Sequence, residues 1–321
     1  MAYNSSNEAN IVRQELYDAS LEKSLDDWLV GRPLFDDKTG VFPDGDTLEI
    51  TKTGDRAVSD YEEDTAITFD NMQTSRVNLS ITEYKQDAWY ITDKLKIDGQ
   101  QAEAFWAENV RKSQIAMERQ LEKDVLAVAN QQTLGNANAI NGKAHRFIGS
   151  GTGGALQTED ISALKLAFDA AYVPTENRVL IINPDMEFEL NKLLNITEVS
   201  NGSTFNFNVD GMVQTGFGDR LNIIRNIFGF NIMVSHNLPD VTAETLTKFD
   251  GTGSTSVTGK ACIAMSMADA SSMPFMGAIR QRPVSEFFRD TKYKRDEWSS
   301  TCRYGFGLKR AETLAVIATP V

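Results

Sequence analysis

The side chains able to do metal or nucleophilic chemistry are few and scattered along this 321-residue chain. The two histidines, His145 and His236, have no second metal ligand at a typical spacing, so we expect structural or surface histidines and no metal site. The two cysteines, Cys262 and Cys302, form no Cys-x-x-Cys pair and are predicted to be free core thiols. No Gly-x-Ser-x-Gly motif marks a nucleophilic serine. The sequence therefore indicates neither a metal centre nor a covalent catalytic centre.

An acidic segment and a glycine-rich run are the remaining places where chemistry could occur. Asp185, Glu187 and Glu189 fall in the first turns of a predicted helix, where the helix dipole alone favours carboxylates. An unrecognised α/β hydrolase that uses residues 183–189 stays open as an alternative of a different class. Residues 150–154 (SGTGG) lack the Gly-Lys-Ser/Thr that follows in a phosphate-binding loop. We therefore predict no catalytic residue, no cofactor and no enzymatic activity.

The composition indicates a folded protein with a sizeable core, since 41% of the residues are hydrophobic and 24% are charged. No apolar run reaches the roughly 18 to 20 residues of a membrane span, and the N-terminus does not resemble a signal peptide. We therefore predict a cytoplasmic protein with no membrane partner. The net charge of −13 would repel nucleic acid, so any DNA beside this protein is expected to be enclosed without sequence-specific binding.

Charge is unevenly distributed, with an acidic cluster and a basic cluster far apart in the sequence. The acidic cluster is Asp60, Glu62, Glu63 and Asp64, and the basic cluster is Arg280, Arg282, Arg289, Lys292, Lys294 and Arg295. Two solvated faces are the simplest explanation, because an isolated surface ion pair contributes only about 0 to 1 kcal/mol. Repeated around a closed assembly, however, complementary clusters would set how copies align. We predict contacts between subunits through Asp60, Tyr61, Glu62, Glu63, Asp64, Arg280, Arg282, Arg289, Lys292 and Arg295.

One long helix, predicted over residues 98–131, is the element around which the rest of the chain is arranged. The stretch contains no proline, and Asp98 with Gln101 has the spacing of a capping box. Apolar residues recur at helical spacing along one face, namely Ala102, Trp106, Val110, Met117, Leu121, Val125 and Val128. Such a helix would be roughly 50 Å long, about as wide as a compact globule of the whole chain. Either the subunit is flat, or the helix extends beyond it.

Before this helix, residues 46–76 are a polar excursion with little to pack against. We predict two short strands, at residues 46–50 and 65–70, on either side of a segment that ends in the acidic cluster. Because an isolated two-stranded ribbon is marginal in water, the excursion needs a surface from elsewhere. A mobile surface hairpin is the alternative. Residues 77–82 then alternate as in a strand with one covered face, and residues 89–91 lead on towards the helix.

The rest of the chain combines helices and strands, which predicts an α+β fold. Residues 160–172 are an amphipathic helix, residues 178–182 are a buried strand, and Asn183 caps a helix that opens with Pro184. Further strands are predicted on both sides of Gly229 and at residues 261–267, 278–290 and 314–318. Residues 7–30 have the pattern of an amphipathic helix, which could equally pack on its own domain or on a neighbouring subunit.

The order of these parts, together with several short motifs, resembles a known family. The motifs are residues 45–50 (GDTLEI), Asp60 with Tyr61, residues 77–84, Val173 with Pro174, Arg178, residues 182–184 (INP), residues 227–232 (IFGFNI) with Ser235, Asn237, Leu238 and Pro239, and Tyr304 with Gly305 followed by residues 315–317. With the long helix, they resemble the major capsid proteins of tailed bacteriophages, which have the Hong Kong 97-type fold. In that family, residues 315–317 would lie in the closing strand of the peripheral domain.

The resemblance implies a Hong Kong 97-like α+β fold with five parts. They are an N-terminal arm at residues 1–45, an extended β-hairpin loop at 46–76, a peripheral domain at 77–155 and 270–321 with a spine helix at 98–131, and an axial domain at 156–269. In the family, the extended loop lies across the neighbouring subunit and the N-terminal arm reaches another. The parts would therefore be arranged for contacts between copies.

The implied function is that of a structural subunit of an icosahedral phage head, which self-assembles into pentamers and hexamers. These form a procapsid with scaffolding and portal proteins, which expands as double-stranded DNA is packaged, and a decoration protein is an optional further partner. Only about 45 residues precede the loop, so we expect a separate scaffolding protein. The subunit would assemble in the host bacterial cytoplasm and reside in the virion.

Two details of the resemblance stay open. Some members of the family cross-link their subunits through a loop lysine, and Lys52 is available here, although no motif supports this reaction. An encapsulin-like nanocompartment, which shares the fold but encloses a protein cargo, is the nearest alternative function.

Overall fold

The computed structural model describes residues 34–41, 45, 47–54, 58, 60–64, 66, 69, 71, 74–98, 102–132, 138–194, 199–200, 203–204 and 226–320. The helices are α1 (Asp93–Asp98), α2 (Ala102–Ala127), α3 (Thr158–Ala170) and α4 (Pro184–Leu194), with 3-10 turns at Thr39–Val41, Val128–Gln131 and Thr152–Gly154. The strands are β1 (Phe35–Asp37), β2 (Thr47–Thr53), β3 (Thr74–Ser80), β4 (Glu83–Thr92), β5 (Arg146–Ile148), β6 (Arg178–Ile182), β7 (Val199–Ser200), β8 (Ser203–Thr204), β9 (Asn226–Ile227), β10 (Phe230–Val234), β11 (Asp240–Leu246), β12 (Thr255–Ser266), β13 (Phe275–Asp290), β14 (Arg295–Leu308) and β15 (Leu314–Pro320). The mixture of helices and strands is the α+β content predicted above.

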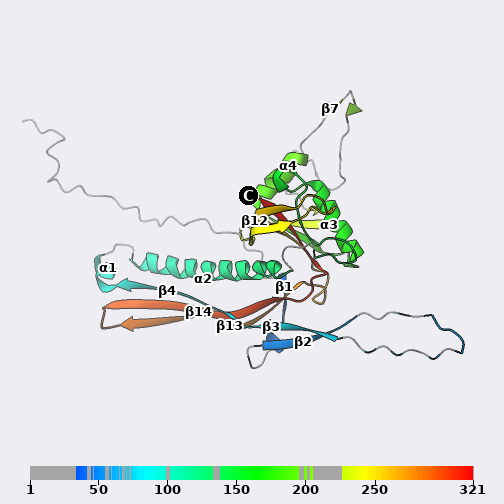
Figure 1. Ribbon diagram of the computed structural model, residues 1–321. Coiled ribbons are helices and arrows are strands. Elements are labelled where there is room, and N and C mark those ends of the chain that lie inside the picture. The colour runs from blue at the N-terminus through cyan, green and yellow to red at the C-terminus, as the bar shows by residue number, and fades with distance from the viewer. Residues whose placement is uncertain are drawn as a thin grey trace, which may run out of the picture.

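A four-stranded sheet in the order β1-β13-β14-β4 runs beside α2, as Figure 1 shows. We call its three long strands, β4, β13 and β14, the hairpin sheet. Trp298 of β14 lies opposite Trp89 of β4, and the Trp89 ring contacts Trp106 of α2 with 4.3 Å between ring centroids. At the other end of the contact, the Tyr304 hydroxyl donates to Asp124 of α2 at 2.8 Å. One face of the hairpin sheet is therefore covered by the long helix.

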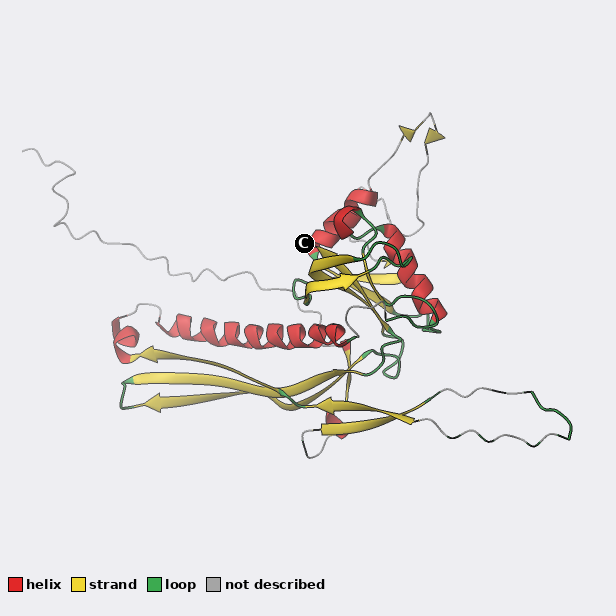
Figure 2. Ribbon diagram, viewed as in Figure 1, coloured by secondary structure: helices red, strands yellow, loops and turns green. Residues whose placement is uncertain are grey.

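A second sheet has the order β5-β15-β12-β6-β10-β9, with β11 paired to β12. All five residues of β6 are buried, as expected for a strand covered on both faces. Figure 2 shows α3 and α4 packed beside this sheet. Met117 and Val125 of α2 belong to the same buried cluster as Ile181 and Ile263 of the sheet, so the end of the long helix and the seven strands share one core.

The last strand differs from its expected place. Residues 314–318 were assigned by resemblance to the peripheral domain, beside the long helix, but β15 pairs with β12 and β5 in the seven-stranded sheet. The physical reason is burial, because every residue of β15 before Pro320 is buried. Such a strand needs cover on both faces, and the interior of the seven-stranded sheet supplies it.

The polar excursion also pairs differently from the prediction. We call β2 and β3 the ribbon, and residues 54–73 between them the loop. Thr47 to Thr53 pair with Ser80 to Thr74. The prediction of a partner strand at residues 65–70 is wrong, because the described residues 66 and 69 are not in a strand. Leu79 is fully buried, but Phe69 is 90% exposed, so only the later segment has a surface to hold it as a strand.

The long helix is present, but its start differs from the prediction. Asp98 is the last residue of α1 and not a helix cap, and α2 begins at Ala102. The predicted apolar face is buried at Met117, Leu121, Val125 and Val128, while Trp106 and Val110 are half-buried. The α2 helix therefore packs most deeply at its C-terminal end. Among the described residues, no helix is both long and apolar enough to cross a membrane.

Candidate assembly interface

The loop carries the acidic cluster and several apolar side chains that contact little of their own subunit. Val58 is 99% exposed, Phe69 is 90% exposed and Tyr61 is 74% exposed. The predicted contact residues of the acidic cluster, Asp60, Glu62, Glu63 and Asp64, are all exposed as well. Soluble monomers seldom expose apolar side chains together in this way, so a surface of this kind indicates a partner.

The ribbon, by contrast, is anchored firmly at its root. Leu79 and Ile81 form a small buried cluster with Met276 and Ala278 of β13, and Leu48, Ile50 and Val77 pack against it. Gly305 of β14 approaches the ribbon closely, since a Cβ at this position would lie 2.2 Å from the carbonyl oxygen of Ser80. The Tyr304 and Gly305 motif thus has a structural reason. The Tyr304 hydroxyl donates a hydrogen bond to α2, and the lack of a side chain at Gly305 lets β3 approach β14 closely.

Farther along the ribbon, one ion pair connects it to the seven-stranded sheet. The Lys52 ammonium lies 2.5 Å from a carboxylate oxygen of Glu312, in the turn before β15. The pair spans an open groove of about 830 Å³ between the ribbon and the loops that follow α3 and β12. Partial burial of Glu312 raises its pKa, but Lys52, a backbone N–H and Arg310 outweigh burial and hold the pKa below its ordinary value.

We expect Glu312→Gln to loosen the angle between the ribbon and the seven-stranded sheet without unfolding either. The shift in population should be at most about fivefold, since a half-exposed pair contributes only about 0 to 1 kcal/mol. Spin labels on Thr53→Cys and Tyr172→Cys, which both line the groove, would show a broader distance distribution. Because the folded pKa is lowered, the wild-type contribution is present above the ordinary glutamate pKa and lost as pH falls through the lowered value.

The control for this experiment is Arg76→Gln, because the Arg76 pair with Glu49 joins β3 to β2 within the ribbon. This variant should leave the distance distribution unchanged. An identical distribution in Glu312→Gln and wild type would show that Lys52 does not set the angle.

Two arginines of the basic cluster, Arg289 and Arg295, are neutralised within their own subunit. The Arg289 guanidinium donates to both oxygens of Asp93, at 2.5 and 2.6 Å, and to Asp296 at 2.6 Å. The Arg289 hydrogen bonds lower the pKa of Asp93, and Lys96 followed by Arg289 lowers the pKa of Asp296. Arg295 pairs with Glu297 at 2.6 Å and stacks on the Tyr90 ring. Arg289 and Arg295 therefore already form ion pairs with carboxylates of the same subunit.

The other predicted basic residues lie at exposed positions of the hairpin sheet and its turn. Arg280 and Arg282 are exposed, and the register of β13 against β14 shifts at both positions. Such bulges in an edge strand redirect side chains and discourage further strand pairing. Lys292, at the turn between β13 and β14, is exposed and lies over the Tyr293 ring at 5.5 Å.

The two predicted charge clusters do not meet within one subunit. The turn between β13 and β14, beside α1, lies at one end of the molecule, and the described loop residues lie beyond the opposite end, as Figure 1 shows. A direct contact between the described loop residues and the residues of this turn can therefore form only between two copies of the chain. The sequence predicted both clusters, but it could not show their separation.

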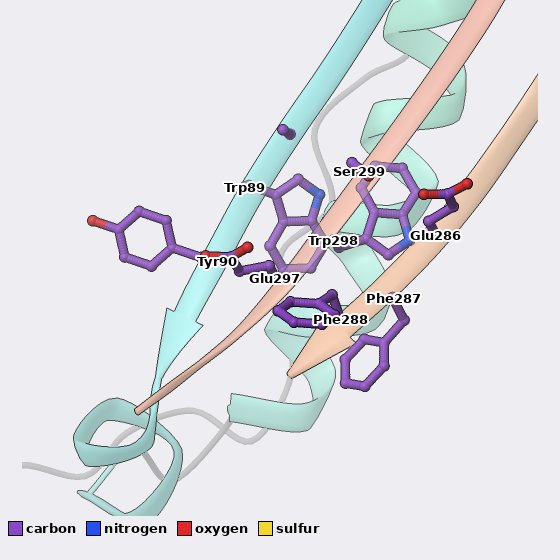
Figure 3. A pocket seen from close by; sticks show the side chains of 9 residues that line it. Trp89, Tyr90, Glu286, Phe287, Phe288, Glu297, Trp298 and Ser299 are labelled. Atoms are coloured by element: carbon purple, nitrogen blue, oxygen red, sulfur yellow. The ribbon is translucent and has the colours of Figure 1, made fainter. Parts of the chain in front are cut away.

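The face of the hairpin sheet that points away from α2 is a further surface, which sequence reasoning missed. On this open face Tyr84, Tyr90 and Phe288 are 63%, 59% and 64% exposed. Ala88 and Ser299, which lie opposite each other, line a depression of about 590 Å³ together with the rings of Tyr90 and Phe288 and the carboxylates of Glu286 and Glu297. Figure 3 shows the side chains that line it, from β4, β13 and β14. Every second residue of β4 is exposed, and these residues include the aromatic Tyr84 and Tyr90. Aromatic residues at alternating positions of the strand were the signal in the sequence that could have indicated this face.

Of the histidines and cysteines, all but the exposed His236 are buried, and the acidic and glycine-rich segments considered with them form hydrogen bonds within the fold. Burial lowers the pKa of His145 and raises the pKa of Cys262, so the histidine is neutral and the thiol is protonated near pH 7. The Ser150 N–H of the glycine-rich run donates to Asp160. The Asn183 amide donates to Asp185, at the start of α4. Within the described ranges, no three His, Cys, Asp or Glu side chains are grouped as a metal site.

Comparison with known proteins places this geometry among phage capsid proteins. A family model described as phage capsid protein matches residues 75–318. No curated protein sequence matches the chain. A solved structure from Mycobacterium phage Che8 has a TM-score of 0.68 at 18% identity, covering 96% of this chain and 97% of that one.

Two further solved structures are similar over nearly their full lengths. The mature capsid of bacteriophage PhiM1 has a TM-score of 0.67 at 11% identity, covering 96% of this chain and 92% of that one. The capsid of a native GTA particle has a TM-score of 0.63 at 10% identity, covering 100% of both chains. At these identities the likeness establishes the shared fold.

Proposed function

Because this chain belongs to the phage capsid protein family, we propose that it is a structural subunit of an icosahedral phage head that assembles through pentamers and hexamers. The observation that best supports the proposal is the loop, whose described apolar and acidic side chains are exposed. A loop of this kind is useful to a shell, in which every subunit has neighbours on several sides. Its function lies in contacts between copies.

The two large sheets are the basis for assigning the domains of the subunit. We propose that α2 with the hairpin sheet is the peripheral domain, and that the seven-stranded sheet with α3 and α4 is the axial domain, with β15 assigned to the latter. Residues 1–45 are proposed as the N-terminal arm, and the ribbon and loop as the extended loop. The predicted helix at residues 7–30 lies outside the described residues.

Further partners of the proposed shell follow from the same function. They are a separate scaffolding protein, a portal protein, packaged double-stranded DNA and, optionally, a decoration protein, with assembly in the host bacterial cytoplasm. The net charge of −13 is suited to a lining that repels DNA and lets the genome move. Neither an encapsulin-like compartment nor a hydrolase at residues 183–189 has an observation that favours it over the phage shell.

Charge reversal in the loop tests whether electrostatics contribute to the contacts between copies. We expect Asp60→Lys, Glu62→Lys and Glu63→Lys together to slow shell assembly at least about tenfold, because attraction to a basic surface becomes repulsion. Asp64 is left unchanged because its φ of 65° is unfavourable for lysine. Light scattering during assembly, at several salt concentrations, measures the effect.

The matched control neutralises the same positions, with Asp60→Asn, Glu62→Gln and Glu63→Gln. This variant should show a smaller reduction than the lysine variant, and added salt should slow wild-type assembly. If the lysine variant assembles at the wild-type rate in all salts, the electrostatic contribution is absent and only the apolar residues of the loop matter.

A further inference from the structure

One buried histidine lies near the ion pair that holds the ribbon to the seven-stranded sheet. His145 comes just before β5 and is fully buried, and its ring stacks on Phe168 of α3 with 6.2 Å between ring centroids. Its Nδ1 lies 3.1 Å from the carbonyl oxygen of Lys143, and because a carbonyl only accepts, Nδ1 carries the hydrogen. Nε2 is then an acceptor, and it has no hydrogen-bond partner within the described ranges. The next proton that His145 binds must therefore enter at Nε2.

The Glu312 carboxylate can accept a hydrogen bond from that proton. One of its oxygens accepts from the Lys52 ammonium at 2.5 Å, whereas Oε2 is buried and has no hydrogen-bond partner among the residues that the structure describes. Burial lowers the pKa of His145, and the hydrogen bond to Lys143 and the negative charge of Glu312 oppose this shift. Two buried acceptors, His145 Nε2 and Glu312 Oε2, thus interact electrostatically and lack only a proton between them.

We propose that His145 is an acid-sensitive release for the ribbon: once protonated, its Nε2–H competes with Lys52 for the Glu312 carboxylate and loosens the ribbon from the seven-stranded sheet. Such a release acts within one subunit and does not depend on shell assembly. Because the ribbon carries the loop, loosening it widens the range of directions in which the loop can point.

The remaining charged groups around His145 have partners of their own. They are Arg146 with Glu244 on β5 and β11, Arg178 with Asp169 beyond the Phe168 ring of α3, and Arg310, whose positive charge acts on Glu312. Lys143 contributes its carbonyl oxygen to the Nδ1 hydrogen bond. Glu312 is therefore the charge with which a protonated His145 interacts most directly.

The two groups titrate in different pH ranges. Because burial lowers the pKa of His145, the neutral histidine stabilises the folded ribbon contact above the ordinary value of 6.5, and this contribution is lost as pH falls through the lowered value. The pKa of Glu312 lies below its ordinary value of 4.5, so its carboxylate is still charged when His145 begins to bind its proton. The ribbon should therefore be released before Glu312 itself is protonated.

Spin-label distances measured in the full chain as pH falls test this release. Labels on Thr53→Cys and Tyr172→Cys line the groove, and we expect their distance distribution to broaden with a midpoint between 4.5 and 6.5. His145→Phe keeps an aromatic ring beside Phe168 and should move the midpoint below 4.5, where only Glu312 titrates. The matched control is His236→Gln, which removes the other, exposed histidine and should leave the midpoint unchanged.

A histidine NMR titration in the His236→Gln background measures the protonation of His145 directly. Lys52→Met removes the competing cation and should raise the His145 midpoint by about half a pH unit, whereas Glu312→Gln removes the attraction and should lower it by a similar amount. Both variants keep His145, so they decide the question even if His145→Phe melts at a lower temperature. A His145 midpoint that is the same in both variants, or a wild-type distance distribution that broadens only below 4.5, would overturn the proposal.

Discussion

Replacing residues 54–73 with the dipeptide Asn-Gly is expected to abolish shell formation while leaving the melting temperature of the subunit almost unchanged. Thr53 and Thr74 are paired at the end of the ribbon, so a two-residue turn can close it without disturbing the strands. The removed segment buries little of its own subunit, since Val58, Tyr61 and Phe69 are exposed. Thermal unfolding and electron microscopy of the same preparation measure both outcomes.

Leu79→Ala provides the control for this prediction, because Leu79 is fully buried at the ribbon root. Removing that side chain should destabilise the subunit by about 2 to 5 kcal/mol. If the loop variant melts as low as Leu79→Ala, the loop packs on its own subunit. Normal shells from the loop variant would show that the loop is dispensable for assembly.

Arg146→Ala is expected to have the largest effect on stability. Arg146 is fully buried and donates to both oxygens of Glu244 at 2.6 Å. It also donates to the carbonyl of Ala129 and the side chain of Asn130, just after α2. Truncation leaves the Glu244 carboxylate buried without its counter-ion, which costs about 3 to 5 kcal/mol. Equilibrium unfolding in urea would measure the loss.

The double variant Arg146→Met with Glu244→Leu separates the lost pair from the uncompensated charge. It should be more stable than Arg146→Ala, because no carboxylate is left buried alone. A double variant that is less stable than the single variant would show that the Glu244 carboxylate keeps stabilising contacts of its own when Arg146 is absent.

Local patterns in the sequence predicted much of the fold, and the family and Hong Kong 97-like fold indicated by resemblance are confirmed. The apolar spacing of α2 predicted the long helix, and its deepest positions, such as Leu121 and Val125, are buried. Asn183 and Pro184 correctly predicted the start of α4. Such signals lie within one turn or one strand, so they can be read without knowing the tertiary structure.

The errors concern contacts between distant segments. The sequence could not show that Asp93, from α1, neutralises Arg289 almost two hundred residues later. Nor could it show that β2 pairs with β3, because residues 65–70 (TAITFD) also have the composition of a short strand. The open face was missed for a similar reason, since exposure of Tyr84 and Tyr90 depends on which side α2 covers.

Electron cryomicroscopy of particles formed by the full chain, alone or co-expressed with a scaffolding protein, tests the central claim most directly. We expect closed shells of pentamers and hexamers in which residues 54–73 cross from one subunit to the next. A chain that stays a compact monomer at high concentration, or a shell in which these residues fold back on their own subunit, would contradict the account.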